Sequence, residues 1–245
     1  MIYVLIPAFN EAAHLARLLP RVTRRAEGRP VRTVVVCDGS KDGTCRVAAD
    51  NGAGVIELWP NSGKGSAVRV GAARLTGRDF DAVVTMDGDG QHDPDDLAGL
   101  LRPVLAKECD MAIGSRYLAD SSRGPTPLNR YLVRTLFTHL LRRRLQQPVT
   151  DPFAGYRCMS PRAFRQIRLT GNRYEGELEV RFEAELHGLK VLEVPIGRIY
   201  TGDQSKMGER GGTLRGRLSV LRSYVTTTRR KTRELTASRR QTPVA

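Results

Sequence analysis

Short apolar runs alternate with amphipathic stretches along the first half of the chain. The runs are four or five residues long and rich in Val and Ile, which is typical of buried strands. The stretches between them repeat apolar residues at helical spacing, over 11–25, from about residue 42, over 63–75 and over 94–106. Strands and helices that alternate in this way favour an α/β fold with a mostly parallel central sheet. The predicted strands are residues 2–6, 33–37, 55–58, 82–86 and 111–114.

Two later segments predict basic amphipathic helices. One covers about residues 127–146, where Leu recurs every fourth position from Leu128 to Leu140 with arginines between. The other carries a stripe of Leu214, Leu218, Leu221 and Val225 flanked by arginines. Such a stripe alone is equally compatible with packing on the sheet, but the arginines favour contact with an anionic membrane surface. The last residues, from Arg233 to Ala245, are expected to be disordered.

The net charge of +14 is concentrated in the second half of the chain. Residues 1–122 are nearly neutral, with 15 basic and 16 acidic side chains. Residues 123–168 carry 10 basic side chains against 1 acidic, and residues 206–245 carry 11 against 2. Arg outnumbers Lys by 34 to 6, so a bias of composition explains part of the excess. Its uneven distribution indicates a surface for an anionic partner.

Cysteine spacing and apolar run length exclude several classes of protein. The four cysteines lie far apart and form no Cys-x-x-Cys pair, which argues against a disulfide scaffold and a structural zinc site. The apolar runs are shorter than the roughly 20 residues that a membrane-spanning helix needs. No signal peptide precedes the first predicted strand. We therefore expect a cytoplasmic protein whose membrane contact is peripheral.

Polar residues follow three of the predicted strands where each strand ends. They are the segments Pro7–Glu11, Asp38–Thr44 and Asp87–Pro94. Ligands of open parallel sheets bind beyond the carboxyl ends of the strands, so these segments are expected to form one site. Asp42 and Thr44 are equally compatible with ordinary turn or cap residues.

The segment Asp87-Gly-Asp89-Gly-Gln91 predicts a metal site. Carboxylate and amide oxygens suit Mg²⁺ or Mn²⁺, and a divalent ion offsets the repulsion between two close carboxylates. An EF-hand calcium loop is excluded, since its required Gly and Glu positions hold His92 and Ala98.

The segment Asn61-Ser-Gly-Lys64-Gly-Ser resembles a phosphate-binding loop but lacks the Walker A spacing. A dinucleotide-binding glycine fingerprint is also missing. Lys64, at the start of a predicted helix, remains a candidate contact for a diphosphate or a sugar.

These motifs, in this order, resemble family 2 glycosyltransferases of the GT-A fold, which has a Rossmann-like sheet. Within the family they are most similar to the branch of dolichol-phosphate mannosyltransferases and other polyprenyl-phosphate glycosyltransferases. The resemblance extends over about residues 2–207, leaving 208–245 as a basic helix and tail. Besides the segments above, the matching motifs are Gly114-Ser-Arg-Tyr117, Arg130, Asp151-x-x-x-Gly-Tyr-Arg157 and Glu193-Val-Pro-Ile196 with Tyr200, Ser205 and Lys206.

The resemblance implies an inverting transfer of a hexose from a nucleotide-diphosphate sugar, of the GDP-mannose or UDP-glucose type, to a polyprenyl or dolichyl phosphate. It implies that Asp87, Asp89 and Gln91 hold the metal, and that residues 193–206 include a mobile segment that closes over the donor. The implied donor-binding residues are Pro7, Ala8, Asn10, Glu11, Asp38, Gly39, Ser40, Lys64, Asp87, Gly88, Asp89 and Lys206.

On the acceptor side, an arginine cluster is implied to bind the phosphate, with Asp89, Arg116 and Arg130 as the catalytic residues. A phosphate oxygen is already anionic at neutral pH, so no strong general base is needed. Glu177 would act as a base only on a hydroxyl acceptor, and its acid-rich surroundings favour a solvated side chain. We assign no catalytic role to His92. The implied acceptor-side residues are Arg116, Arg130, Arg134, Asp151, Arg157 and Glu177.

Two positions depart from the family pattern. The family usually has two adjacent acids in the base-binding segment, and here Cys37 precedes Asp38. A small polar residue is usual four positions after Arg130, and here it is Arg134.

Three alternative functions stay open from the sequence. The same donor chemistry could serve a saccharide or small-molecule hydroxyl. A nucleic-acid-binding role is a remote alternative, because aromatic residues are only 6% of the chain and none is interleaved with the terminal basic segment. A degenerate binding module is disfavoured by the intact Asp87, Asp89 and Gln91.

Overall fold

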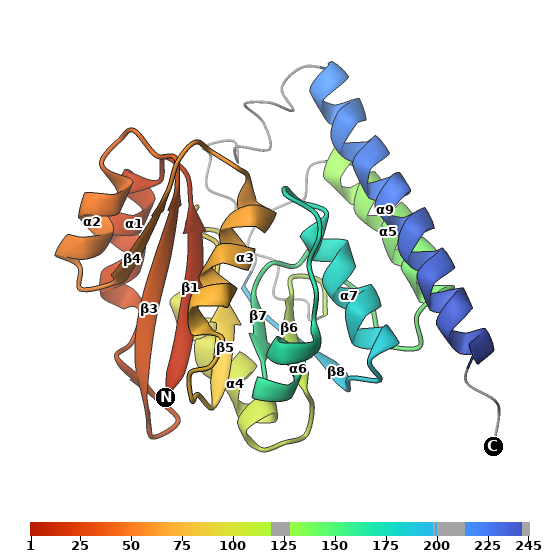
Figure 1. The fold of residues 1–245 in the computed structure, drawn as a ribbon, viewed down its shortest axis with the longest axis horizontal. Helices are drawn as coiled ribbons and strands as arrows, with labels where there is room; N and C mark the ends of the chain where they lie inside the picture. The colour runs from red at the N-terminus through yellow and green to blue at the C-terminus, as the bar shows by residue number, and fades with distance from the viewer. Residues whose placement is uncertain (119–127, 198, 200–213, 242–245) are drawn as a thin grey trace.

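The computed structural model describes residues 1–118, 128–197, 199 and 214–241, with the backbone alone for 128–130, 214–218 and 240–241. One mixed sheet runs through the described residues in the order β4-β3-β1-β5-β7-β6-β8 (Figure 1). Its strands are β1 (Ile2–Ala8), β3 (Arg29–Asp38), β4 (Gly54–Leu58), β5 (Ala82–Thr85), β6 (Met111–Ser115), β7 (Arg157–Met159) and β8 (Val191–Pro195).

The strands β4, β3, β1 and β5 are parallel, as the alternating pattern predicted. The short strand β7 is antiparallel to both of its neighbours, β5 and β6. This insertion was not predicted, because three residues carry no recognisable alternation. It matters for function, since it carries Arg157 into the middle of the sheet directly beside β5.

The predicted helix over 11–25 is wrong in its second half. Helix α1 covers only Ala12–Leu18 and is followed by a 3-10 turn, η1 (Leu19–Arg21), with Pro20 at its start. The chain then forms the short strand β2 (Arg25–Ala26), which pairs antiparallel with the beginning of β3.

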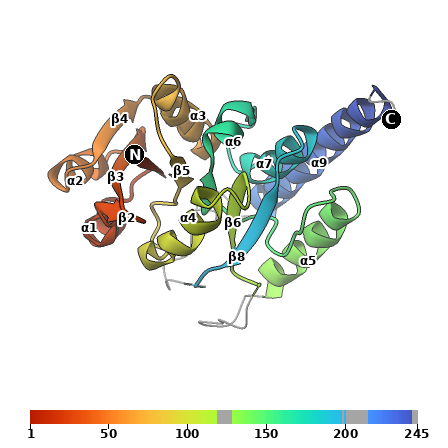
Figure 2. The ribbon, with the colours of Figure 1, turned by 90° about the horizontal axis from the view of Figure 1, so that it is seen from below.

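Helices cover both faces of the sheet because successive residues of β1 point to opposite sides (Figures 1 and 2). Ile2, Val4 and Ile6 share a core with α1, α2 and α4, whereas Tyr3 and Leu5 face α3. The strands β6 to β8 pack against α6 and α7. These helices are α2 (Thr44–Asp50), α3 (Lys64–Leu75), α4 (Leu97–Leu105, after the 3-10 turn η2, Pro94–Asp96), α6 (Pro161–Gln166) and α7 (Gly176–Leu186).

The two basic helices lie beyond α7, side by side (Figures 1 and 2). Helix α5 covers Leu128–Arg142 and α9 covers Leu214–Gln241. Phe137 of α5, Phe182 of α7 and Tyr224 of α9 share one apolar core. The expected disorder from Arg233 onward is wrong as far as residue 241, because α9 continues to that point.

Salt bridges to α7 hold α9 in place. Lys231 of α9 lies 2.7 Å from Glu183 of α7, and both side chains are buried. Arg239 contacts Glu185 at 2.7 Å, and Arg230 contacts the buried Glu179. The acidic face of α7 is therefore covered by α9, so several of the basic residues of α9 serve internal packing and not a membrane surface.

Candidate active site

The loops after β1 and β3 are tied together at the carboxyl edge of the sheet. The backbone N–H of Asn10 donates to Ser40 Oγ at 3.1 Å, and that of Glu11 donates to Thr44 Oγ1 at 2.8 Å. Asp42 accepts from the backbone of Ala12 and of Thr44. Asp42 and Thr44 are thus turn residues, as the sequence also allowed, and they tie the two loops together.

Asp38 anchors the loop that precedes α3. Its buried carboxylate accepts hydrogen bonds from the backbone N–H groups of Ser62 and Gly63, at 2.8 and 2.7 Å, and from the Asn61 side chain. A Cβ atom at Gly39, where φ is +72°, would lie 2.5 Å from the Asn61 nitrogen, so only glycine permits this close approach. Through this loop, Asp38 positions Lys64.

A cluster of opposite charges lies between α3, the end of β5, β7 and α7. Lys64 Nζ lies 2.7 Å from Asp87 Oδ1 and 2.6 Å from Glu177 Oε1. The other oxygen of Glu177 accepts from Arg157, whose guanidinium is buried. A Cβ atom at Gly155 would lie 3.0 Å from both Lys64 Nζ and Asp87 Oδ2, which explains the glycine there. We call Lys64, Asp87, Asp89 and Glu177 the donor cluster.

The four groups differ in their electrostatics. Burial opposes the charge on Lys64, yet Asp87 and Glu177 raise its pKa above the ordinary value. Burial would raise the pKa of Asp87, but the Lys64 ammonium lowers it. Burial and then the charge of Asp87 raise the pKa of Asp89 to about 6. Lys64 therefore compensates Asp87, while no cation among the described residues contacts Asp89 directly.

The oxygen-bearing side chains of Asp87, Asp89 and Gln91 are of the kind that a divalent ion takes as ligands. The hydrogen-bond partner recorded for the Asp89 carboxylate is the backbone N–H of Gln91, at 3.0 Å. A half-buried carboxylate that a neighbouring carboxylate repels is stabilised by a hard cation. Within the described residues, no three His, Cys, Asp or Glu side chains gather closely enough to hold a metal alone. Asp87, Asp89 and Gln91 would therefore leave positions open for ligand oxygens.

His92 is a structural residue of the same loop, as the sequence analysis expected. Its Nδ1 accepts from the backbone N–H of Asp87 at 2.9 Å, and its ring stacks on Tyr156 with centroids 4.9 Å apart. Burial lowers the pKa of His92 to about 4, so the ring is neutral near pH 7 and fixes the orientation of the Asp87 backbone.

Arg116 and Arg134 approach each other around Tyr117. The Arg116 guanidinium makes a two-pronged bond to the buried Asp151, at 2.7 and 3.0 Å. Arg134 of α5 lies 4.3 Å from the Tyr117 ring centroid and bonds the carbonyl of Thr150. Burial alone would raise the pKa of Asp151, but Arg116 lowers it below the ordinary value.

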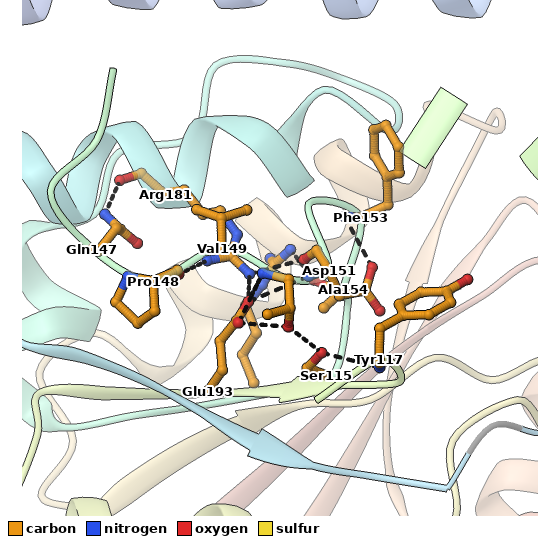
Figure 3. Close-up of polar contacts among 12 residues, drawn as sticks. Ser115, Tyr117, Gln147, Pro148, Val149, Asp151, Phe153, Ala154, Arg181 and Glu193 are labelled. Atoms are coloured by element: carbon orange, nitrogen blue, oxygen red, sulfur yellow. Dashed lines mark hydrogen bonds and ion pairs between the residues drawn. The ribbon is translucent and has the colours of Figure 1, made fainter. Parts of the chain in front are cut away.

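A second buried network holds the loop that carries Asp151 (Figure 3). Arg181 of α7 and Glu193 of β8 form an ion pair at 2.5 Å with both side chains 1% exposed. Glu193 accepts from the backbone N–H and hydroxyl of Thr150, and Arg181 donates to the carbonyl of Asp151 at 2.8 Å. We call these four residues with Arg116 the Glu193 network. It fixes the loop that orients Asp151.

Three expectations about these residues were wrong. Glu177 is not a solvated acid: it is buried, and its carboxylate pairs with both Lys64 and Arg157. Glu193, Val194 and Pro195 are not part of a mobile segment, because they belong to β8 and pair in register with β6. Arg157 lies on the donor side, in contact with Glu177, and does not join Arg116 and Arg134.

Some expected site residues cannot be placed. Tyr200, Ser205 and Lys206 lie outside the described residues. Arg130 belongs to α5, one turn before Arg134, but its side chain is also outside the described part. The backbone of Pro7, Ala8 and Gly88 lies at the same edge of the sheet as Asp38 and Asp87.

Sequence reasoning missed the structural role of Arg181 and a pocket beside Trp59. A lone arginine in an acid-rich helix carries no sequence signal for burial, although its pairing with Glu193 decides its position. The pocket has a volume of about 300 Å³ and lies beyond the ends of β3 and β4. Trp59, which is 71% exposed, is the signal that could have indicated it.

Helix α5 presents an apolar face outward. Tyr131, Leu132 and Leu136 are 47%, 59% and 51% exposed, whereas Phe137 and Leu141 of the same helix are fully buried. Exposed Arg142 and Arg143 lie at its end. None of the helices in the described residues combines the length and apolar character that crossing a bilayer requires.

The four cysteines are free thiols, so no disulfide constrains this fold.

The chain is similar to known glycosyltransferases over most of its length. Residues 3–168 match the model of glycosyl transferase family 2. The polyprenol monophosphomannose synthase of Mycolicibacterium smegmatis is 31% identical over 202 residues, covering 79% of this chain and 75% of that protein. The undecaprenyl-phosphate mannosyltransferase of Micrococcus luteus is 30% identical, covering 80% and 82%.

The fold is that of a solved GT-A enzyme. Glucosyl-3-phosphoglycerate synthase from Mycobacterium tuberculosis, in complex with UDP, superimposes with a TM-score of 0.73 at 20% identity, covering 95% of this chain and 80% of that one. Another structure of that synthase holds Mn²⁺ with UDP-glucose and phosphoglyceric acid. The match to the family model over more than half of its length, together with this fold, shows that the chain belongs to glycosyl transferase family 2 and is a glycosyltransferase.

Proposed function

We propose that this glycosyltransferase moves a hexose, with inversion, from a nucleotide-diphosphate sugar to a polyprenyl phosphate, and that it uses Mg²⁺ or Mn²⁺. The observation that carries the donor half is the half-buried Asp89 carboxylate, whose pKa is raised beside Asp87 at the carboxyl edge of the sheet. A site that concentrates uncompensated negative charge is completed by a divalent ion together with a diphosphate.

The residues of the donor cluster contribute in different ways to binding a diphosphate. When bound, the divalent ion stabilises the charge that develops on the leaving diphosphate. Lys64, fixed at the start of α3 by the loop on Asp38, supplies a second positive charge beside Asp87. Glu177 and Arg157 hold Lys64 in place from the opposite side.

The acceptor half rests on Arg116 and Arg134, with Arg130 one helical turn away. Guanidinium groups bind phosphate through paired hydrogen bonds. Asp151 orients Arg116 through both of its oxygens. An anionic phosphate oxygen attacks without a general base, and Glu177, bound to two cations, is poorly suited to be one. Relatives named for transfer to polyprenol and undecaprenyl phosphate support this acceptor.

The exposed side chains of α5 support peripheral binding at the cytoplasmic face of a membrane. Tyr131, Leu132 and Leu136 would insert among lipid headgroups, next to Arg134 and Arg143. Each basic residue near an anionic leaflet contributes about 1 kcal/mol. A lipid-linked acceptor would then reach the arginine cluster from the bilayer.

The direct test is transfer from GDP-mannose and UDP-glucose to polyprenyl phosphate, with Mg²⁺ or Mn²⁺. We expect product with one donor, and loss of product in EDTA. Full activity in EDTA would contradict the metal assignment. Transfer to a free saccharide but not to the lipid phosphate would contradict the acceptor.

A variant test separates acceptor from donor binding. The double variant Arg130→Glu, Arg134→Glu should raise the KM for the lipid phosphate at least tenfold and leave donor binding within about twofold. Arg102→Glu, an exposed arginine on α4, is the matched control. Equal loss of donor and acceptor binding would contradict the assigned role.

A further inference from the structure

The pocket beside Trp59 is joined to the donor cluster by directly bonded residues. Its lining includes Gly39 and Ser40 of the loop after β3, and Glu57 and Trp59 at the end of β4. Asp38, next to Gly39, bonds the loop that leads to Lys64, and Lys64 contacts Asp87. Along the chain this loop leads from the pocket to Lys64 and Asp87, so a nucleotide bound at both places would follow it. Its volume, about 300 Å³, is at the lower end for small-ligand pockets.

Trp59 gives this pocket a flat aromatic wall. The ring is 71% exposed, and Lys41 lies 5.6 Å from its centroid. Exposed aromatic rings stack with the flat faces of nucleobases. Trp59 is also the single tryptophan of the chain, so its fluorescence reports on this pocket alone.

Glu57 is the one charged side chain in the lining of the pocket. It pairs in register with Cys37 on the neighbouring parallel strand, so both side chains point to the same face of the sheet. Within the described residues no hydrogen bond or ion pair is recorded for its carboxylate. Cys37 cannot supply a charge of its own, because burial and the neighbouring Cys45 raise the pKa of its thiol.

We propose that this pocket holds the base of the donor nucleotide, and that the Glu57 carboxylate, with Trp59 as stacking wall, selects guanine over uracil. This inference rests on the proposed function. Guanine presents two adjacent donors, N1–H and the 2-amino group, which match the two oxygens of a carboxylate. Uracil presents one N–H between two carbonyl oxygens, and these repel the second carboxylate oxygen. The geometry of Glu57 thus favours GDP-linked over UDP-linked sugars.

The test uses the full chain with GDP and UDP, each with Mn²⁺, followed by Trp59 fluorescence and by calorimetry. We expect GDP to bind at least tenfold more tightly than UDP and to quench the fluorescence. In Glu57→Gln the GDP affinity should fall about tenfold, while UDP affinity stays within about twofold or rises. Glu108→Gln, an exposed glutamate outside the pocket lining, is the matched control.

The outcomes distinguish this inference from the proposed function. Binding of UDP as tight as that of GDP, or an unchanged GDP preference in Glu57→Gln, overturns the role of Glu57 and leaves the glycosyl transfer intact. Absence of binding for both nucleotides overturns the proposed donor and the inference together. Trp59→Phe should retain most of the calorimetric GDP affinity and Trp59→Ala should lose about tenfold; equal affinities in the two variants overturn the stacking role.

Discussion

Two charged clusters of this enzyme lie at the same edge of the sheet and differ in how completely their charges are compensated. In the Glu193 network, Arg181 and Glu193 are 1% exposed and each charged group has close partners. In the donor cluster, one ammonium is shared between Asp87 and Glu177, and in the part of the chain that the structure describes Asp89 has no direct cation. A buried network whose charges are all paired holds other groups in position. A cluster with an unpaired charge is instead suited to bind a ligand of opposite charge.

The two clusters also differ in how exposed their side chains are. Lys64 and Asp87 are 22% and 25% exposed, enough for a ligand to reach them. Arg181 and Glu193 are inaccessible, and their hydrogen bonds connect through Thr150 and Asp151 to Arg116. The predictions below test whether the donor cluster binds ligands while the Glu193 network holds the fold.

The largest effect is expected for Asp89→Asn. Loss of the uncompensated carboxylate should lower metal-dependent transfer by about 10³-fold or more, since a metal contributes several kcal/mol to the transition state. The metal-free protein should keep or gain thermal stability, because the repulsion from Asp87 is relieved. Activity and melting temperature are measured beside the control Asp79→Asn, an exposed residue. An active Asp89→Asn enzyme would show that the donor cluster is not the catalytic one.

Arg181→Met should destabilise the protein and leave nucleotide binding at the donor site unchanged. Removing one partner of a buried ion pair leaves Glu193 uncompensated and costs about 3 kcal/mol or more of unfolding free energy. The double variant Arg181→Met, Glu193→Gln should recover part of this loss. Urea unfolding measures the free energies, and GDP or UDP affinity should stay unchanged. A single variant as stable as the parent would contradict the assigned role of the pair.

Lys64→Met should strengthen the binding of Mn²⁺ in the absence of nucleotide by about tenfold, or about 1.4 kcal/mol. The ammonium now occupies the cation position beside Asp87, at 2.7 Å, and competes with any metal there. Titration of Mn²⁺ followed by electron paramagnetic resonance measures the change, with Lys107→Met as an exposed control. Weaker Mn²⁺ binding in the variant would mean that Lys64 supports the metal site and does not compete with it.

The smallest effect is a pH dependence from Asp151. Because Arg116 holds the folded-state pKa of Asp151 below its unfolded value, the ion pair stabilises the fold above about pH 4 and loses this contribution as the pH falls through the folded pKa. The difference in unfolding free energy between the parent and Asp151→Asn should therefore shrink from pH 6 to pH 3. Urea unfolding at several pH values measures it. A constant difference would mean that the charge of Asp151 does not stabilise the fold.

Most of the parallel half of the fold could be predicted from the sequence. The strands from Ile2 to Leu58 and the helix starting at Lys64 lie within a few residues of their predicted places. The acids at Asp87 and Asp89 also lie at the predicted edge. These features depend on local periodicity and on the rule that ligands meet the carboxyl ends of parallel strands, both of which are readable along the chain.

The partners of the charged side chains could not be predicted in the same way. Glu177 looked like one solvated acid among several, but it lies 113 positions from Lys64 in the chain and bonds it directly. The sequence also carried no sign that other acidic residues of α7 are paired. In the structure, Arg230 and Lys231 of α9 form ion pairs with them. Periodicity tells which face of a helix is apolar, and not which distant charge will lie against the other face.

The sequence by itself determined the family, the order of strands and helices in the first half, and the loops that carry the donor chemistry. Tertiary structure decided that β7 runs antiparallel between β5 and β6, that Arg181 is buried with Glu193, and that α9 packs on α7. The physical reason is that backbone pattern is a local property, whereas the energy of a buried charge depends on partners that only the folded chain brings within bonding distance.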